Sequence, residues 1–181
     1  MPGYACFLRG VNLGARRKAS STDLGSCFEG LGFEEVSTFR TSGNVVFETG
    51  RESRAKLTAR IERGLAKSLG YDVTVFLRTA SEIQAIAAHE PFPAKLAEAS
   101  KGKLQVALLP AKPSAGVQKK VLAAATEEDR LAFGDRELYW LPSTGTRDSA
   151  LDLGSIEGLV GPTTMRTKGT VEQLVAKYFA G

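Results

Sequence analysis

Apolar positions along the first eighty residues follow two spacings, one typical of strands and one typical of helices. Short or alternating apolar runs of strand length occupy residues 4–9, 35–40, 44–48 and 72–78. Apolar residues at helical spacing occupy residues 22–31 and a longer segment with Leu57, Ile61, Leu65 and Leu69, which Gly70 ends. The predicted order is therefore strand, helix, strand, strand, helix, strand.

The second half of the chain follows a similar plan with a different ending. A capping box at residues 81–84 starts a helix, and the apolar runs that follow predict strands at residues 103–109, 131–133 and 137–141. Helices are predicted at residues 114–125, 151–159 and 170–179, whereas the polar, basic segment 163–168 is predicted as a loop. No residue match between the halves is apparent, so an internal duplication is expected at the level of the fold only.

The order of the first half is that of the ferredoxin-like, or split βαβ, arrangement, in which two helices cover one face of an antiparallel sheet. We predict an α+β fold of two lobes packed as one compact unit. Residues 1–79 form the ferredoxin-like βαββαβ sandwich. Residues 80–181 form a related α/β lobe with extra C-terminal helices.

Two motifs of the first lobe resemble a known family. They are Phe7-Leu8-Arg9-Gly10-Val11-Asn12-Leu13-Gly14 and Thr41-Ser42-Gly43-Asn44-Val45-Val46-Phe47, the second followed by the long helix. Their order and spacing are similar to those of domain of unknown function 1697, a family of uncharacterised bacterial proteins. The resemblance implies two ferredoxin-like lobes and no established activity. The later part departs from it, with Ser149-Ala150-Leu151 where Ser-Lys-Leu is common and Arg166-Thr167-Lys168 where Arg-Asn-Trp is common.

The composition is that of an ordinary globular protein, with 43% hydrophobic and 24% charged residues among 181. The two cysteines, Cys6 and Cys27, are too few for a disulfide framework and are interpreted as reduced thiols. No cluster has metal-ligand spacing, and no cofactor is predicted. The chain shows neither a signal peptide nor an apolar stretch of roughly 18 residues, so we expect a cytoplasmic protein that does not enter a membrane.

The loop after the first predicted strand, residues 10–21, is the strongest candidate for a binding site. It exceeds the usual connection of roughly 4–6 residues, and the next helix begins directly behind it. Backbone N–H groups freed by glycine, arginine side chains and a helix start all favour anions. The spacing matches neither a Walker loop nor a dinucleotide fingerprint. We predict a small phosphate- or carboxylate-bearing ligand, with a mobile surface loop as the alternative. The candidate residues are Arg9, Gly10, Asn12, Gly14, Arg16, Arg17 and Lys18.

Three further candidates lie outside this loop. Ser42 and Asn44 belong to the predicted hairpin turn, which lies at the same end of the sheet as Asn12 or at the opposite end, depending on register. A plain turn is the alternative. Arg166, in the predicted loop 163–168, would supply a second anion contact, and a loop with a helix cap is the alternative.

Two other functions remain open. A face that carries Phe7, Phe39 and Phe76 is too apolar to stay bare, and it would be covered by the second lobe or by a second copy of the chain. A nucleic-acid binder would stack bases on this face and bind phosphates with the Lys- and Arg-rich segments 1–20, 51–70 and 101–125. The net charge of the chain is +4. A protein-interaction module would use it as its contact, and monomer and homodimer are both open. No nucleophile–base pair is apparent around His89, the single histidine, so no reaction is predicted.

Overall fold

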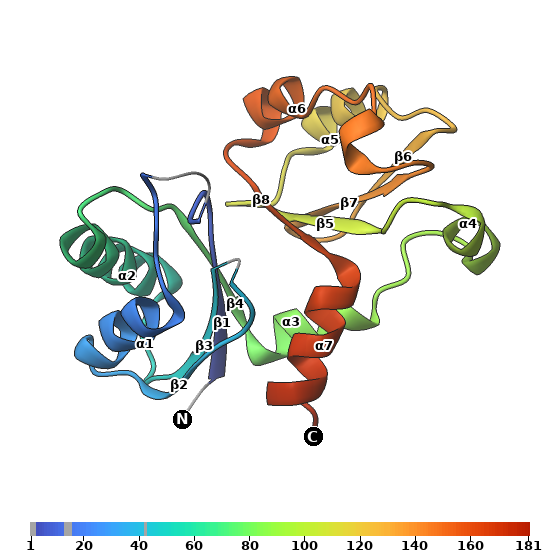
Figure 1. The fold of residues 1–181 in the computed structure, drawn as a ribbon. Helices are drawn as coiled ribbons and strands as arrows, with labels where there is room; N and C mark the ends of the chain where they lie inside the picture. Colours follow the sequence, from blue (N-terminus) through green and yellow to red (C-terminus); the bar gives the residue numbers. More distant parts are fainter. Residues whose placement is uncertain (1–2, 13–15, 42) are drawn as a thin grey trace. The chain divides into compact units, whose positions relative to one another are not determined.

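The computed structural model describes residues 3–12, 16–41 and 43–181 of the chain (Figure 1). The chain divides into two compact units. The first comprises Met1–Gln84 together with Ala176–Gly181, and the second comprises Ala85–Val175. Among the described residues, each unit contains one four-stranded antiparallel sheet with helices, which makes the protein α+β, as the sequence predicted.

The sheet of the first unit has the strand order β2-β3-β1-β4. Its strands are β1 (Gly3–Leu8), β2 (Glu34–Thr38), β3 (Asn44–Glu48) and β4 (Val75–Thr79). The helices α1 (Ser21–Gly30) and α2 (Arg54–Leu69) connect them and cover one face of the sheet (Figure 1). All six elements occur in the predicted order, and the last strand begins at Val75, three residues later than expected.

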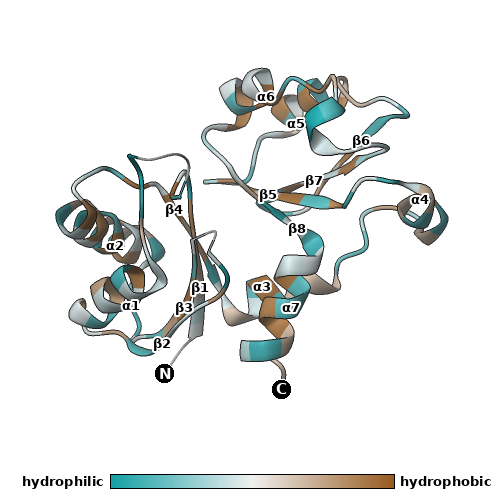
Figure 2. Cartoon of the chain, in the orientation of Figure 1, coloured by the Kyte–Doolittle hydropathy of each residue, from teal (hydrophilic) through white to brown (hydrophobic). Residues whose placement is uncertain are grey.

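The core of the first unit lies between this sheet and its two helices. Tyr4, Cys6 and Leu8 of β1 point into it, whereas the alternate residues Ala5 and Phe7 lie on the other face. The hydrophobic sides of α1 and α2 face the strands (Figure 2). The remaining buried members of this core include Phe28, Phe33, Phe47, Leu57, Ile61, Leu65, Val73, Val75 and Leu77.

The opposite face of the first sheet is also covered. Phe7 and Phe76 pair across β1 and β4, and both are buried. Phe39 is half-buried, and the ring of Tyr178 meets it edge-on with 6.1 Å between centroids. Tyr178 is the last residue of α7 (Lys168–Tyr178), whose end belongs to the first unit. The prediction that these rings do not stay bare is therefore consistent with the fold, since neither Phe7 nor Phe76 is accessible.

The helix α3 (Ala80–Ala88) begins without a loop, and its cap differs from the predicted one. The backbone N–H of Glu82 donates to Thr79 Oγ1 at 3.2 Å, and the Thr79 N–H donates back to Glu82 Oε2 at 2.8 Å. This reciprocal pair lies two residues before the predicted box at residues 81–84. Gln84 instead donates its side-chain N–H to the carbonyl of Phe179 at 2.6 Å. The shift arises because β4 runs directly into the helix, so the last strand residue becomes the cap.

The second unit repeats the connectivity of the first. Its sheet has the order β6-β7-β5-β8, formed by β5 (Gln105–Leu108), β6 (Asp129–Phe133), β7 (Glu137–Pro142) and β8 (Thr164–Thr167). The helices α5 (Ala115–Leu122) and α6 (Leu153–Val160) pack on one face of it. Two short elements, α4 (Ala94–Ala99) and the 3-10 turn η1 (Thr146–Asp148), lie in its connections.

The strand β8 corrects the prediction of a polar loop at residues 163–168. It pairs with β5, with Thr167 opposite Gln105 and Thr164 opposite Leu108. Thr164 and Arg166 are buried, although both are polar. Their segment shows no apolar alternation, so its strand character depends on pairing with β5 rather than on its own pattern.

Matching residues become visible once the two topologies are aligned. The last strand of each unit ends in Arg-Thr, and in each unit the threonine caps the helix that follows directly: Thr79 caps α3, and Thr167 Oγ1 accepts from the Thr170 N–H at 3.2 Å. The helix that follows the first strand of each sheet is capped by the serine of a Lys-x-Ser sequence, Ser20 in α1 and Ser114 in α5. Lys18 and Lys112 therefore occupy equivalent positions, each two residues before the capping serine.

A buried carboxyl group organises the second unit. Asp129 Oδ1 accepts from the indole N–H of Trp140 at 2.8 Å and from the hydroxyl of Ser149 at 2.6 Å. Ser149 therefore holds its loop to β6. The cap of α6 is Asp152, which accepts from the Ser155 N–H at 3.0 Å.

Replacing Asp129 with alanine is expected to lower the free energy of unfolding of the second unit by about 2 kcal/mol, because the buried indole N–H loses its acceptor. Trp140 is the only tryptophan of the chain, so urea unfolding followed by its fluorescence reports on this site. Asp135→Ala is the control, since Asp135 is exposed and its ion pair with Lys112, at 3.6 Å, is worth less than about 0.5 kcal/mol. Equal losses in the two variants would contradict the assignment.

Candidate functional site

Asn12 joins the loop after β1 to the hairpin turn between β2 and β3. Its side-chain N–H donates to the carbonyl of Thr41 at 2.7 Å, and its Oδ1 accepts from the N–H of Ala19 at 2.9 Å. Its own N–H donates to the carbonyl of Arg17 at 2.6 Å. Asn12 has a φ of +58°, a left-handed conformation that asparagine tolerates better than most residues. The loop and the turn therefore lie at the same end of the sheet, which the sequence left open.

The turn itself is held by Gly43 and Asn44. The carbonyl of Gly43 accepts from the N–H of Leu8 at 2.8 Å. Asn44 is fully buried, and its side-chain N–H donates to the carbonyl of Phe39 at 2.8 Å. The buried side-chain amide of Asn44 thus stabilises the turn by a hydrogen bond to its backbone. The candidates Gly14 and Ser42 lie outside the described residues.

A depression of about 400 Å³ opens where the loop, the turn and the start of α1 meet. Lys18 and Ser21 are exposed in it, and Ser20 caps the helix. The Ser20 hydroxyl accepts a hydrogen bond from the Asp23 N–H, and the Asp23 carboxyl group accepts one from the Ser20 N–H. No described residue accepts a hydrogen bond from the N–H of Ser21 or Thr22, as is usual in a first helical turn. The lining residues are Asn12, Lys18, Ala19, Ser20, Ser21 and Thr41.

Arg17 is engaged with the connection between α2 and β4. Its Nη2 donates to the carbonyl of Asp72 at 2.5 Å, and its guanidinium lies 5.0 Å from the ring centroid of Tyr71. The Tyr71 hydroxyl donates to the carbonyl of Lys18 at 3.1 Å. Partial burial raises the pKa of Tyr71 above its ordinary value, and the charge of Arg17 opposes that rise. Arg17 therefore shapes the loop, whereas the sequence predicted that it contacts the ligand.

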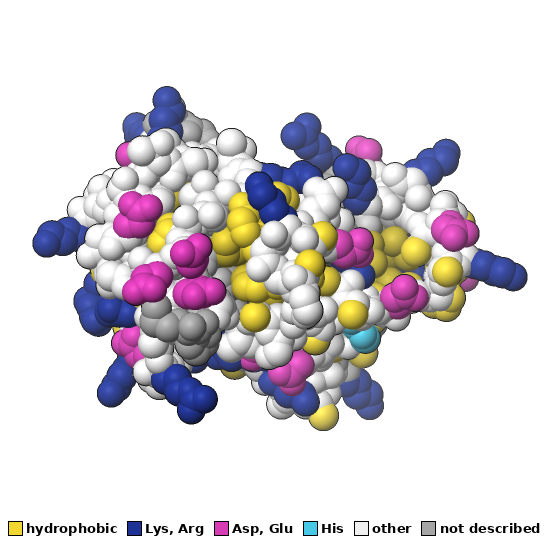
Figure 3. Space-filling model, turned by 90° about the horizontal axis from the view of Figure 1, so that it is seen from below, with side chains coloured by type: hydrophobic (Ala, Val, Ile, Leu, Met, Phe, Trp, Pro, Cys, Tyr) yellow, Lys and Arg dark blue, Asp and Glu magenta, His cyan; other side chains and the backbone are white. Residues whose placement is uncertain are grey.

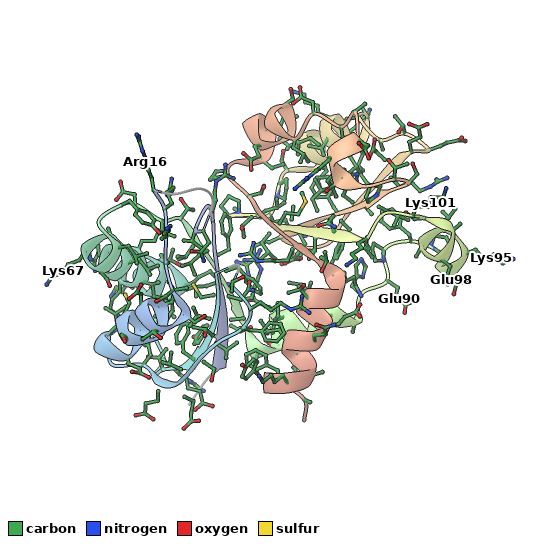
Figure 4. The ribbon with its side chains drawn as sticks, viewed as in Figure 1. Arg16, Lys67, Glu90, Lys95, Glu98 and Lys101 are labelled. Carbon is green, nitrogen blue, oxygen red and sulfur yellow. The ribbon has the colours of Figure 1, made fainter. Side chains whose placement is uncertain are left out.

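The remaining described candidates of the first unit, Arg9, Gly10 and Arg16, do not line this depression. Arg9 is half-exposed, and its N–H donates to the carbonyl of Thr74 at 2.9 Å. Gly10 has a φ of +71°, which favours glycine at this bend. The exposed side chain of Arg16 points away from the unit (Figure 4).

Arg166 belongs to the second unit and lies on β8, not in a loop. Its Nη1 donates to Thr164 Oγ1 at 2.8 Å and to the carbonyl of Met165 at 2.9 Å. Its side chain is buried on the strand, because strand pairing with β5 replaces the expected loop. The structure therefore does not offer Arg166 as the predicted loop contact.

Sequence reasoning missed two contributors, Thr41 and Tyr71. Thr41 contributes a backbone carbonyl, which has no sequence signature, and Tyr71 lies 53 positions from its partner Lys18. Gly70, the left-handed end of α2, was recognised, and it marks the point where the chain turns toward Tyr71.

Within the described residues, no group of three or more His, Cys, Asp or Glu side chains is arranged to hold a metal ion. Neither Cys6 nor Cys27 takes part in a disulfide bond. None of the described helices is both long enough and apolar enough to cross a membrane.

The comparisons with known proteins bear on the fold and the family. A conserved bacterial protein, SP0830 from Streptococcus pneumoniae, superimposes with a TM-score of 0.73 at 21% identity, over 96% of each chain. A second structure, of the protein TA0507, has 12% identity and a TM-score of 0.24, which is too dissimilar to support an argument. A search of curated proteins found no match. The profile of the family described as protein of unknown function, DUF1697, matches residues 1–139, which include both motifs. The chain therefore belongs to the DUF1697 family.

Proposed function

We propose that the depression at the start of α1 binds a small ligand through its phosphate or carboxylate group. The observation that carries the proposal is that Lys18 and the first turn of α1 line the same hollow of about 400 Å³, where the N–H groups of Ser21 and Thr22 have no acceptor among the described residues. Both donor types favour an anion, the lysine through its charge and the helix start through its dipole.

Asp23 sets a limit on this attraction. Its carboxyl group lies in the first turn of α1, where it closes the capping box with Ser20. A negative charge there offsets part of the positive potential of the helix start. The positive charge of Lys18 must then supply most of the net attraction for an anion, so the proposal depends on that side chain. Arg9, Gly10 and Arg16 do not line the depression, and their contact with a ligand stays a prediction.

Replacing Lys18 with alanine is expected to weaken the binding of inorganic phosphate or of a small carboxylate about tenfold, through the loss of a charge-assisted contact. The measurement is a titration followed by amide chemical shifts, with sodium chloride at equal ionic strength as the reference. Shifts should gather on Asn12 and on residues 18–22.

Lys112→Ala is the matched control for this experiment. Lys112 precedes the capping serine of α5 by two residues, as Lys18 precedes that of α1, but it is ion-paired with Asp135. Its removal should leave phosphate binding unchanged. An equal effect of both lysines would reduce the binding to nonspecific charge attraction, and unchanged binding in the Lys18 variant would refute the proposal.

We also propose that each unit contains a ferredoxin-like βαββαβ sandwich, the first formed by β1 to β4 within residues 1–79 and the second by β5 to β8 within residues 80–181. The strand orders β2-β3-β1-β4 and β6-β7-β5-β8 support this assignment, because the first strand of each unit pairs with the last. Small ligands in such a fold are bound by loops at the strand ends rather than by the fold as such, which agrees with a site in the loop after β1.

No comparable observation favours the two alternatives. Base stacking and a protein contact both required the Phe7 and Phe76 rings, and these rings are buried. On the face seen in Figure 3, Lys and Arg side chains are interspersed with Asp and Glu, so that face shows no continuous basic stripe of the kind nucleic-acid binders use. We therefore rank a small anion above a nucleic acid or a protein partner.

A further inference from the structure

We infer that Arg17 and Tyr71 are positioning residues that hold Lys18 in place at the anion site. The inference rests on the proposed function for its effect on binding. It does not rest on that function for its effect on the loop. Neither residue lines the depression of about 400 Å³, yet both touch the backbone that carries Lys18.

Three hydrogen bonds and one cation–π contact restrain this part of the loop. The carbonyl of Arg17 accepts from the Asn12 N–H at 2.6 Å, and the carbonyl of Lys18 accepts from the Tyr71 hydroxyl at 3.1 Å. The Arg17 side chain also reaches the connection between α2 and β4, where Nη2 donates to the carbonyl of Asp72 at 2.5 Å and the guanidinium lies over the Tyr71 ring. Successive carbonyls of the loop are thereby tied to two separate parts of the unit.

The anchor on the far side is itself well supported. Tyr71 follows Gly70, whose φ of +80° ends α2 and turns the chain, and the ring of Tyr71 packs against the core of the first unit. The segment from Arg16 to Ala19 forms no helix or strand. Its order therefore depends on such side-chain ties, because a loop residue gains no support from a hydrogen-bonded ladder.

A tie of this kind affects affinity without touching the ligand. Ordering the backbone of a lysine on binding costs conformational entropy, and a loop that is already ordered avoids that cost. Arg17 and Tyr71 should therefore raise affinity by placing the Lys18 ammonium group beforehand. This gives Arg17 a different role from the one its charge suggests, since its donors face the Asp72 carbonyl and the Tyr71 ring.

The test is Tyr71→Phe, which keeps the ring under the guanidinium and removes only the hydroxyl. The rate of cleavage after Lys18 by a lysine-specific endoprotease, measured without ligand, reports on the order of the loop. We expect cleavage to become about fivefold faster and inorganic phosphate to bind about fivefold more weakly, as the loss of one neutral hydrogen bond implies. The thermal unfolding midpoint should fall by no more than about 2–4 °C.

Tyr178→Phe is the control, because it removes a tyrosine hydroxyl that donates to the Thr38 carbonyl at 3.4 Å elsewhere in the same unit. It should change neither cleavage after Lys18 nor phosphate binding. Parent rates of cleavage and parent affinity in Tyr71→Phe would overturn the inference and leave the proposed function standing. Faster cleavage in a protein that binds no phosphate at all would refute the proposed function and support the positioning of Lys18.

Discussion

Replacing Phe47 with alanine is expected to lower the free energy of unfolding of the first unit by about 4 kcal/mol, within the range for buried aromatic residues. Phe47 is 2% exposed and stands at the centre of an aromatic cluster. Its ring centroid lies 4.4 Å from that of Phe33, 5.4 Å from that of Phe28 and 5.6 Å from that of Tyr4. The substitution therefore removes a large apolar side chain and three ring contacts, and neighbours from a strand and a helix cannot close the cavity.

The loss is measured by urea unfolding followed by circular dichroism, and Phe39→Ala is the matched control. Phe39 is half-buried and meets one other ring, that of Tyr178, among the described residues. Its removal should cost about 1 kcal/mol, because less area returns to water and no closed cavity forms. Equal losses at Phe39 and Phe47 would mean that the core between sheet and helices does not dominate the stability of this unit.

Replacing Gly43 with alanine is expected to lower the free energy of unfolding of the first unit by about 3 kcal/mol, the second largest effect after that of Phe47→Ala. Gly43 has a φ of +76°, a conformation that costs an L-residue about 1–2 kcal/mol. A Cβ atom there would lie 2.6 Å from Val11 Cγ2 and 3.0 Å from Leu8 Cβ, so the buried end of β1 would have to move. Such overpacking typically adds about 1–3 kcal/mol.

Gly70→Ala separates the two contributions. Gly70 has a nearly equal φ of +80°, but a Cβ atom there would meet no other atom within 4 Å. It should therefore cost only the backbone strain, about 1 kcal/mol, and lower the melting temperature by about 2–4 °C, against roughly 6–12 °C for Gly43→Ala. Similar shifts in both variants would show that the packing of Val11 against the turn contributes nothing.

The Gly43 variant also connects stability with the proposed site. Gly43 contacts the end of β1 directly before the loop, and the carbonyl of Thr41, two residues earlier in the chain, accepts the side-chain hydrogen bond of Asn12. A displaced turn would move that carbonyl and loosen the loop that carries Lys18. Weaker phosphate binding is therefore expected in Gly43→Ala at temperatures where the variant is still folded.

The sequence by itself determined the elements of the first unit. Its strands and helices have clear apolar periods, and a local signal marks the end of α2 at Gly70. These signals act within a few residues, so they can be recognised without knowing the fold. The unusual length and the charge of the loop after β1 likewise marked a candidate site.

Tertiary structure alone decided the rest. The strand β8 forms because β5 supplies its hydrogen-bond partners. The sequence of this polar segment has no apolar alternation from which a strand could be predicted. Asn44 and Arg166 became buried side chains with backbone partners, and Arg17 became bound to a carbonyl 55 positions away, because burial and pairing depend on residues distant in sequence. The same long-range contacts placed Asn12, Lys18 and Thr41 around one depression, which no local pattern encodes.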